Sequence, residues 1–243
     1  MLIINADDFG RSVAETDAAL RCYVAGRITS VSAMVFMADS ERAAELAKEK
    51  ELDVGLHLNF TERFTGKNKC ARLTEYQNRL AIYLGRNKYS QLFYNPLLRK
   101  EFSYSCKAQV EEFTRLFGRP PSRIDGHHHM HLCANLLLSN LIPTGMKIRR
   151  NFSFWPGEKS SSNRAYRALV DRWLARRYRL IDYFFDLTQC IQEKKLNRVA
   201  ALAQSRNVEL MAHPIVPAEA AYLLSDEFQA MLQQVNVGGY ALV

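Results

Sequence analysis

Every histidine of this chain lies in one of three short stretches, and a pair of aspartates lies close to the N-terminus. The stretches hold His57, a dense run from His127 to His131, and His213, and the acidic pair is Asp7-Asp8. Carboxylate and imidazole side chains around an open coordination position form the catalytic metal sites of many hydrolases. The sequence therefore predicts a metal-assisted hydrolase. The metal would polarise a carbonyl group and lower the pKa of its bound water to ~7.

A short apolar run, Leu2–Ile4, is typical of a buried strand, and the acidic pair is expected in the turn after it. One acid at this place would be interpreted as a helix cap or an Asx turn. Two adjacent acids point in different directions, so one can bind a metal while the other acts as a base.

The run Asp125–His131 contains four imidazoles in five positions, between the apolar residues Ile124 and Leu132. A buried imidazole needs hydrogen-bond partners, so four of them are unsuited to simple packing. In an extended run His127, His129 and His131 share a face, and in a helix His127 and His131 do. Both conformations let His127 and one other imidazole meet one cation.

The two single histidines differ in how much they indicate. His57 ends an apolar run, and alone it would be interpreted as an ordinary core or loop residue. His213 precedes Pro214, which favours an extended backbone at the end of a strand. Because imidazole titrates near neutral pH, His213 suits protonation of a leaving amine.

Short apolar runs alternate with helical patterns along the chain, and this predicts parallel βα units. Each candidate residue follows a predicted strand, as in βα-barrel enzymes, whose sites lie at the C-terminal ends of the strands. The segment from 59 to 104 is expected to be a long loop excursion with a helix at 75–84. Strands are expected at 2–4, 29–37, 52–58, 123–125, 146–150, 183–187 and 208–211. Further helices are expected at 13–25, 41–49, 106–117, 134–141, 162–182, 194–204 and 226–234.

The size and composition favour a single domain over residues 1–243. The chain is 48% hydrophobic, and no Pro/Gly/Ser linker or repeat interrupts it. No apolar run reaches the ~20 residues that cross a bilayer, and the N-terminus is unlike a signal peptide. Five scattered cysteines favour a reducing compartment, so a cytoplasmic protein is expected.

The formal net charge is +8, and part of it lies on a basic amphipathic helix expected at 162–182. A solvated surface helix is the simplest interpretation. The alternative is contact with an anionic substrate, an anionic membrane or a lipid-linked glycan. Because no nucleic-acid-binding motif accompanies this charge, no nucleic-acid partner is expected.

Four stretches together resemble motifs of the YdjC family, the carbohydrate deacetylases related to chitooligosaccharide deacetylase and the hopanoid-associated HpnK proteins. They are Asn5–Gly10, Gly55–Asn59, Asp125–His131 and Glu209–Pro214. The resemblance implies a distorted (β/α) barrel with parallel strands. It also implies divalent-metal-dependent removal of N-acetyl groups from an amino sugar. Because the chain ends soon after Gly239, the barrel is expected to be incomplete.

The resemblance also implies roles for individual residues. Asp8, His57 and His127 match the metal ligands, Asp7 matches the general base and His213 the acid. Arg149 is expected to orient a carboxylate or grip the substrate. The residues expected at the substrate are Asn59, His129 and His131. The resemblance points to Mg²⁺, whereas two imidazoles favour Zn²⁺. The expected partner is an N-acetylated sugar. That sugar would be anionic or lipid-linked if the cationic loops face the substrate. A homodimer is also expected.

Two other functions use the same residue types. A metallophosphoesterase would take a similar Asp/His set, but such sites bind two metals with more carboxylates than lie near these histidines. A non-catalytic metal-binding or glycan-binding module would have the ligands and no turnover.

Overall fold

A computed structural model describes residues 1–87 and 89–242, and its strands belong to one sheet. The order of neighbouring strands is β4-β3-β2-β1-β6-β5. The pairs β1–β6, β3–β4 and β5–β6 are parallel. The strands are β1 (Leu2–Phe9), β2 (Ser30–Ala33), β3 (Val54–Leu58), β4 (Ile124–Gly126), β5 (Tyr183–Asp186) and β6 (Val208–Ala212).

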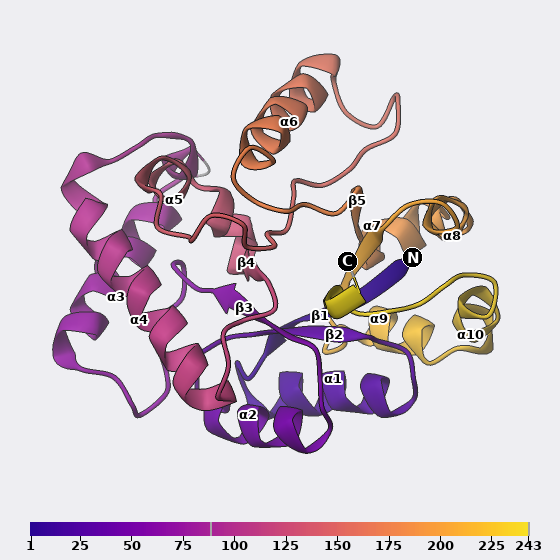
Figure 1. The fold of residues 1–243 in the computed structure, drawn as a ribbon, viewed down its shortest axis with the longest axis horizontal. Coiled ribbons are helices and arrows are strands. Elements are labelled where there is room, and N and C mark those ends of the chain that lie inside the picture. Colours follow the sequence, from indigo (N-terminus) through magenta and orange to yellow (C-terminus); the bar gives the residue numbers. More distant parts are fainter. Residues whose placement is uncertain (88, 243) are drawn as a thin grey trace. The chain divides into compact units, whose positions relative to one another are not determined.

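Helices fill the connections between successive strands, as Figure 1 shows. The first five are α1 (Val13–Val24), α2 (Ser40–Glu49), α3 (Ala71–Gly85), α4 (Arg99–Phe117) and α5 (Ala134–Ser139). The next five are α6 (Ser161–Leu174), α7 (Leu187–Gln192), α8 (Leu196–Ala203), α9 (Pro217–Leu223) and α10 (Asp226–Leu232). Short 3₁₀ turns are η1 (Ser90–Leu92), η2 (Pro96–Leu98), η3 (His127–Leu132) and η4 (Tyr240–Leu242). Among the described residues, no helix is both long and apolar enough to cross a membrane.

Parallel strands joined by helices confirm the predicted α/β fold class with the strand arrangement of a distorted (β/α) barrel. The sheet described has six strands, with β4 and β5 at its two ends, whereas a complete barrel has eight. Every residue of β1, β3 and β6 is buried. Burial on both faces explains the apolar residues of these strands. The strand expected at 2–4 continues to Phe9, so Asp7 and Asp8 lie inside β1 and not after it.

The chain divides into two compact units, and β1 and β2 contribute residues to both. The first unit contains residues 1–7, 17–31 and 144–243, and the second contains residues 8–16 and 32–143. The single domain expected over residues 1–243 therefore stays a prediction.

The first unit has a core formed by β1, β5 and β6. Ile3 packs with Ile181 and Tyr240 in one buried cluster, and Met1 covers it. Phe184 of β5 and Leu210 of β6 have no exposed surface. This core holds the carboxyl ends of the strands that carry Asp7 and Asp186.

The second unit has a core between β3, β4 and the neighbouring helices α3 and α4 (Figure 1). Phe60 packs on Phe102 of α4 at 5.3 Å between ring centroids. Gly55 of β3 faces the buried Arg123, whose Cγ would lie 2.6 Å from a Cβ at this position. Arg123 donates to Ser32 Oγ at 3.1 Å and lies 3.6 Å from the carboxylate of Asp125. A glycine in β3 therefore makes room for a buried arginine beside Asp125.

Three sequence predictions of secondary structure are wrong. The segment expected to be a strand at 146–150 has isolated bridge pairing and forms no strand among the described residues; Lys147 pairs with Arg179 in the turn after α6. The strand expected at 29–37 ends at Ala33, and Phe36 has a φ of +59°, which a strand cannot include. The basic helix expected at 162–182 ends at Leu174.

Candidate functional site

The second unit brings three of the predicted site residues, Asp8, His57 and His127, into one buried cluster. One ligand atom from each lies within 4.8 Å of the others. Asp8 Oδ1 is 2.9 Å from His127 Nδ1 and 3.3 Å from His57 Nε2. Two imidazole nitrogens and one carboxylate oxygen therefore converge, although the three residues lie far apart in the sequence.

Each ligand comes from the end of a strand, as the sequence predicted. Asp8 lies near the end of β1, His57 near the end of β3, and His127 directly after β4. Asp8 has a φ of +64°, a left-handed conformation that aspartate tolerates better than most residues. Such backbone outliers are concentrated at functional sites, where surrounding contacts hold them in place.

Asp125 orients the imidazole of His57. The parallel register places the two residues side by side on β4 and β3, and His57 Nδ1 lies 2.6 Å from Asp125 Oδ1. Ser32 Oγ donates to the other carboxylate oxygen at 2.6 Å. Because a carboxylate accepts hydrogen bonds, Asp125 binds the Nδ1–H group of His57, and the ring is held with Nε2 directed at Asp8.

Glu62 orients the imidazole of His127 in the same way, and sequence reasoning missed it. His127 Nε2 lies 3.1 Å from Glu62 Oε1, which leaves Nδ1 directed at Asp8. Arg11 donates to both oxygens of Glu62, at 2.7 and 3.1 Å. Glu62 lies in a polar loop without periodicity, so only its position five residues after His57 could have drawn attention to it.

Asn59, expected at the substrate, is fully buried and organises the loop that carries Glu62. Its Oδ1 accepts the backbone N–H groups of Thr61 and Glu62, and its Nδ2 donates to the Glu62 carbonyl at 3.1 Å. Gln109 of α4 accepts the Asn59 backbone N–H at 2.7 Å. The side chain of Asn59 therefore binds the backbone of its own loop, and substrate binding by this residue stays a prediction.

The other histidines of the run lie in different surroundings. His128 and His129 have φ values of +51° and +59°, so the run is neither extended nor helical. His128 is exposed, with Thr61 Oγ1 3.0 Å from its Nδ1, and His129 is half-buried. His131 is buried, and its backbone N would lie 2.7 Å from a Cβ added at Gly126. Contact of His129 and His131 with substrate stays a prediction.

The electrostatics of the cluster favour an ionised Asp8. Burial alone would raise the pKa of this carboxyl. Hydrogen bonds from His127 and His57, together with their charge, outweigh burial and hold the pKa well below its usual range. Partial desolvation of the His128 ring, together with the charge of the neighbouring His127, lowers the pKa of His128. The cluster therefore combines a carboxylate with imidazoles that have one nitrogen each aimed at it.

This donor set fits a divalent cation. Zinc and similar ions take imidazole nitrogen and carboxylate oxygen, and such ligand histidines almost always have a hydrogen-bonded second nitrogen. Both His57 and His127 have that feature, on Asp125 and Glu62 respectively. Three protein ligands leave a position for water or substrate, as catalytic sites require.

The first unit holds Asp7 and Arg149 together in a buried ion pair. Arg149 Nη1 and Nη2 donate to the two oxygens of Asp7, both at 2.7 Å. Asn5 donates to Asp7 Oδ1 at 2.7 Å. Arg149 also donates to Glu209 Oε1 at 2.7 and 2.9 Å, and Tyr240 donates to the other oxygen of Glu209. Of the two expected roles of Arg149, the structure shows the contact with a carboxylate.

His213 lies after β6 beside a buried acid, Glu219 of α9. Its backbone N–H donates to Glu219 Oε2, and its Nδ1 lies 4.0 Å from Oε1. Thr188 also donates to Glu219. Burial raises the pKa of Glu219, more strongly than the hydrogen bonds from Thr188 and His213 lower it. Glu219 was not predicted from the sequence, because it follows the His213-Pro214 motif only after an exposed turn.

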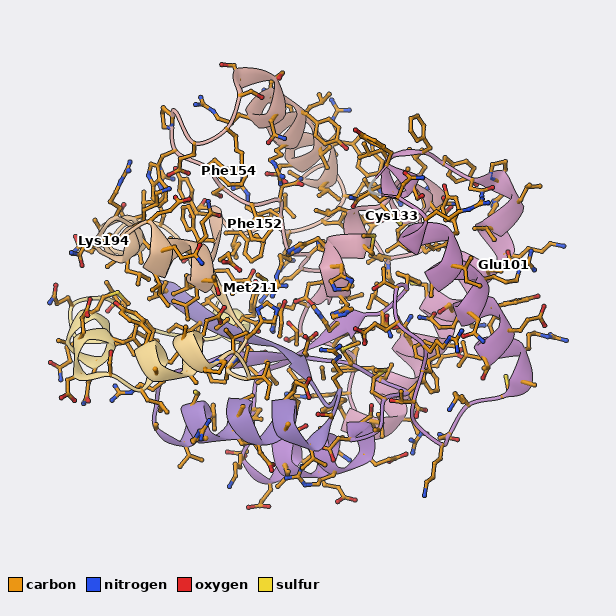
Figure 2. The ribbon with its side chains drawn as sticks, turned by 180° about the vertical axis from the view of Figure 1, so that it is seen from behind. Glu101, Cys133, Phe152, Phe154, Lys194 and Met211 are labelled. Carbon is orange, nitrogen blue, oxygen red and sulfur yellow. The ribbon has the colours of Figure 1, made fainter. Side chains whose placement is uncertain are left out.

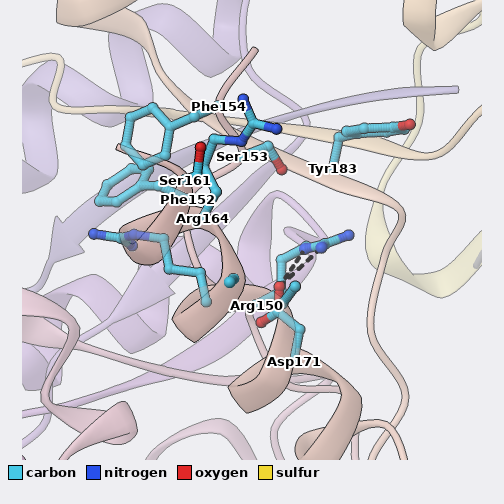
Figure 3. A pocket seen from close by; sticks show the side chains of 11 residues that line it. Arg150, Phe152, Ser153, Phe154, Ser161, Arg164, Asp171 and Tyr183 are labelled. Carbon is cyan, nitrogen blue, oxygen red and sulfur yellow. Dashed lines mark hydrogen bonds and ion pairs between the residues drawn. The ribbon is translucent and has the colours of Figure 1, made fainter. Parts of the chain in front are cut away.

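A cavity of about 420 Å³ lies in the first unit between α6 and the segment 150–154 (Figure 3). The charge of Arg150 on the cavity wall is balanced by Asp171, to which Arg150 donates two hydrogen bonds, at 2.8 and 3.1 Å. Arg167 donates to Asn163, and its guanidinium lies 5.1 Å from the ring centroid of Phe154. Burial lowers the pKa of Arg167. Within the described residues, neither Arg164 nor Arg167 has a carboxylate at ion-pair distance, so this cavity keeps a positive charge.

Aromatic rings form the other wall of the cavity. Phe152 and Phe154 lie next to each other, with ring centroids 6.4 Å apart (Figure 2). Phe152 stacks on Phe184 at 4.6 Å, and the guanidinium of Arg149 lies 4.9 Å over the same Phe184 ring. The ring of Phe184 therefore contacts both Phe152 on the cavity wall and Arg149, the arginine that holds Asp7.

Comparison with known proteins places this chain among related sequences. The family model described as YdjC-like protein matches residues 1–234. The mouse carbohydrate deacetylase is 26% identical over 89% of this chain and 78% of its own length. The chitooligosaccharide deacetylase of Proteus mirabilis is 35% identical over 54% of this chain, which spans 50% of that relative.

A solved structure shares the fold. The crystal structure of an Enterococcus faecalis protein, titled as a candidate cellobiose-phosphate cleavage protein, has a TM-score of 0.69 to this chain. It is 20% identical and covers 99% of this chain and 97% of its own. Because the family model spans nearly the whole sequence, this chain belongs to the YdjC-like protein family.

Proposed function

We propose that this protein is a metal-dependent hydrolase that removes N-acetyl groups from an amino sugar. The observation that carries the proposal is the buried set of Asp8, His57 and His127, in which each imidazole has a carboxylate on its second nitrogen. The relatives named as carbohydrate and chitooligosaccharide deacetylases support the reaction class.

Asp8, His57 and His127 would hold the divalent ion. When bound, that ion supplies a Lewis acid for the acetyl carbonyl and lowers the pKa of water. Asp125 and Glu62 would keep the two imidazoles in the tautomers that bind a cation, and Arg11 holds Glu62 in place. Both Mg²⁺ and Zn²⁺ stay candidates.

Asp7 is proposed as the general base and His213 as the general acid. Arg149 and Asn5 fix both oxygens of Asp7, which precedes the ligand Asp8 by one peptide bond. Asp7 would accept a proton from the attacking water, and His213 would give a proton to the nitrogen of the amine as the C–N bond breaks. Glu219 holds the backbone of His213 at the end of β6.

The substrate is proposed to carry an anionic group, either on the sugar or in a lipid linkage. The cavity beside α6 supports this, because Arg164 and Arg167 add positive charge next to rings that can stack on a sugar. An anion there would offset the cost of half-burying the two guanidinium groups.

Acetate release from a panel of N-acetylated sugars, with and without a chelator, tests the reaction. We expect release that chelation abolishes and that added Zn²⁺ or Mg²⁺ restores. Asp7→Asn should lower kcat by at least ~10²-fold without preventing metal binding. Phosphate release from phosphomonoesters without acetate release would instead favour the phosphoesterase, and metal binding without turnover would favour a binding module.

The charge of the substrate is tested by replacing Arg164 and Arg167 with Gln. KM should rise for an anionic N-acetylated sugar and stay unchanged for its neutral counterpart. Arg172→Gln with Arg176→Gln is the matched control, because both side chains are exposed and neither lines the cavity. Equal effects of the two pairs would contradict a role for the cavity while leaving the deacetylase proposal intact.

A further inference from the structure

The segment between α3 and α4 of the second unit exposes several large apolar side chains together. The relative exposures are 54% for Tyr89, 49% for Leu92, 68% for Phe93 and 83% for Leu97. Single exposed apolar residues are ordinary, but a group within nine positions indicates an interaction surface.

Hydrogen bonds on the inner side hold this segment in place. The hydroxyl of Tyr83 in α3 donates to the carbonyls of Ser90 and Phe93, at 3.0 and 3.2 Å. Asn95 exchanges two hydrogen bonds with the buried Asn135 of α5, at 2.9 and 2.8 Å. The exposed rings and Leu side chains are therefore displayed by a fixed backbone, since its anchors face inward.

The charge around these apolar residues has one sign. Residues 76–100 contain five lysines and arginines and no acid. Arg86, Arg99 and Lys100 are exposed, and the structure gives none of them an ion pair; Lys88 lies outside the described residues. The nearest acid after them, Glu101, is buried and paired with Arg79. The surface of residues 89–100 with Arg86 is therefore apolar with a cationic border.

We propose that residues 89–100, together with Arg86, dock on an anionic lipid bilayer. Aromatic and Leu side chains bordered by Lys and Arg match the depth profile of a membrane interface, where rings enter the head-group layer and cations meet anionic lipids. A second copy of this chain fits less well, because its matching surface would bring like charges together. The segment is separate from the metal-binding residues, so this inference goes beyond the proposed reaction.

Co-sedimentation with lipid vesicles tests the proposal without any activity assay. The purified protein is mixed with vesicles of phosphatidylcholine alone or of phosphatidylcholine with phosphatidylglycerol. We expect binding to the second kind only, weakened by salt. The combined change Leu92→Ser, Phe93→Ser and Leu97→Ser should weaken partitioning about tenfold or more. Arg86→Gln, Arg99→Gln and Lys100→Gln should also weaken it severalfold.

A charge-matched control distinguishes vesicle binding by this surface from attraction caused by the net charge of the protein. Lys48, Lys67 and Lys107 are exposed lysines elsewhere in the second unit, and changing all three to Gln removes the same charge. That control should bind vesicles like the parent protein. The proposal is overturned if no vesicle binds, if both triple Gln variants lose binding equally, or if the Ser variant only dissolves a dimer seen by light scattering.

Discussion

Two carboxylates outside the ligand set determine which nitrogen each imidazole offers at Asp8. Asp125 accepts a hydrogen bond from Nδ1 of His57, whereas Glu62 faces Nε2 of His127, so the two rings direct opposite nitrogens at Asp8. The nitrogen that each ring would offer to a cation therefore depends on residues outside the proposed ligand set. Loss of either acid should affect metal affinity more than it affects the fold.

Replacing Glu62 with Gln should lower the affinity for the divalent ion about 10- to 100-fold, because His127 loses the carboxylate that orients its ring. Isothermal titration of the chelated, then dialysed, protein with Zn²⁺ measures this directly. Glu15→Gln is the matched control, since Glu15 also contacts Arg11 but not His127. If both variants bind Zn²⁺ like the parent, Glu62 does not orient the ligand.

Cys70 should be the cysteine that reacts first in the native protein. Its pKa lies below the usual 9.0, because the N–H of Leu73 at the start of α3 and the hydroxyl of Tyr104 donate to its sulfur. Burial raises the pKa of Cys106 to about 12. A lowered pKa means that thiolate forms at lower pH, so modification by a disulfide reagent should begin below pH 9.

Cys70→Ser should remove this early reaction, and Cys190→Ser, which changes a buried thiol, should leave it unchanged. A reaction that persists in Cys70→Ser would show that another thiol becomes accessible.

At the scale of elements, the turn η3 depends on the lack of a side chain at Gly126. A Cβ there would meet the backbone N of His131 at 2.7 Å, so Gly126→Ala should push η3 away from β4. His127 begins η3, and metal affinity should therefore fall together with the melting temperature. Gly85→Ala is the matched control, because nothing lies within 4 Å of a Cβ there. In a helix that change should stabilise by about 0.5–1 kcal/mol.

Calorimetry with and without Zn²⁺ compares the two alanine variants. A Gly126→Ala protein with parental melting and parental affinity would contradict the close approach at η3.

The sequence predicted elements best where one physical cause determines them. β1, β3 and β6 are buried on both faces, so their apolar runs marked them clearly. The segment 146–150 has apolar residues at alternate positions, Met146 and Ile148, but a strand also needs a partner of sufficient length. Among the described residues, its pairing is with the turn at Arg179. Pairing partners are tertiary information, which explains this error.

The site was predictable where its residues end strands. Asp8, His57 and His127 follow apolar runs, and parallel topology brings the ends of such runs together. Glu62 and Glu219 come from a polar loop and a short helix, and their sequence surroundings resemble those of any exposed acid. Their burial and contacts arise only when the chain is folded, so no spacing rule identifies them.

At the scale of the whole molecule, binding of the metal should raise the melting temperature. An ion that binds the native state stabilises it by mass action, about 2.7 kcal/mol at 100 times Kd, or roughly 5–10 °C for a chain of this length. Asp8→Asn should abolish the shift. Asp226→Asn, an exposed acid at the start of α10, should retain it. An equal shift in both variants would place the ion elsewhere.

The space that Gly55 leaves for Arg123 has a consequence for how relatives of this protein can diverge. Any side chain at position 55 would collide with the buried guanidinium stem, and a small residue at 123 would leave a hole beside Asp125. A substitution at either position alone should therefore destabilise the folded protein. Across descendants of a common ancestor the two are therefore expected to change together, and an alignment should show them as a covarying pair.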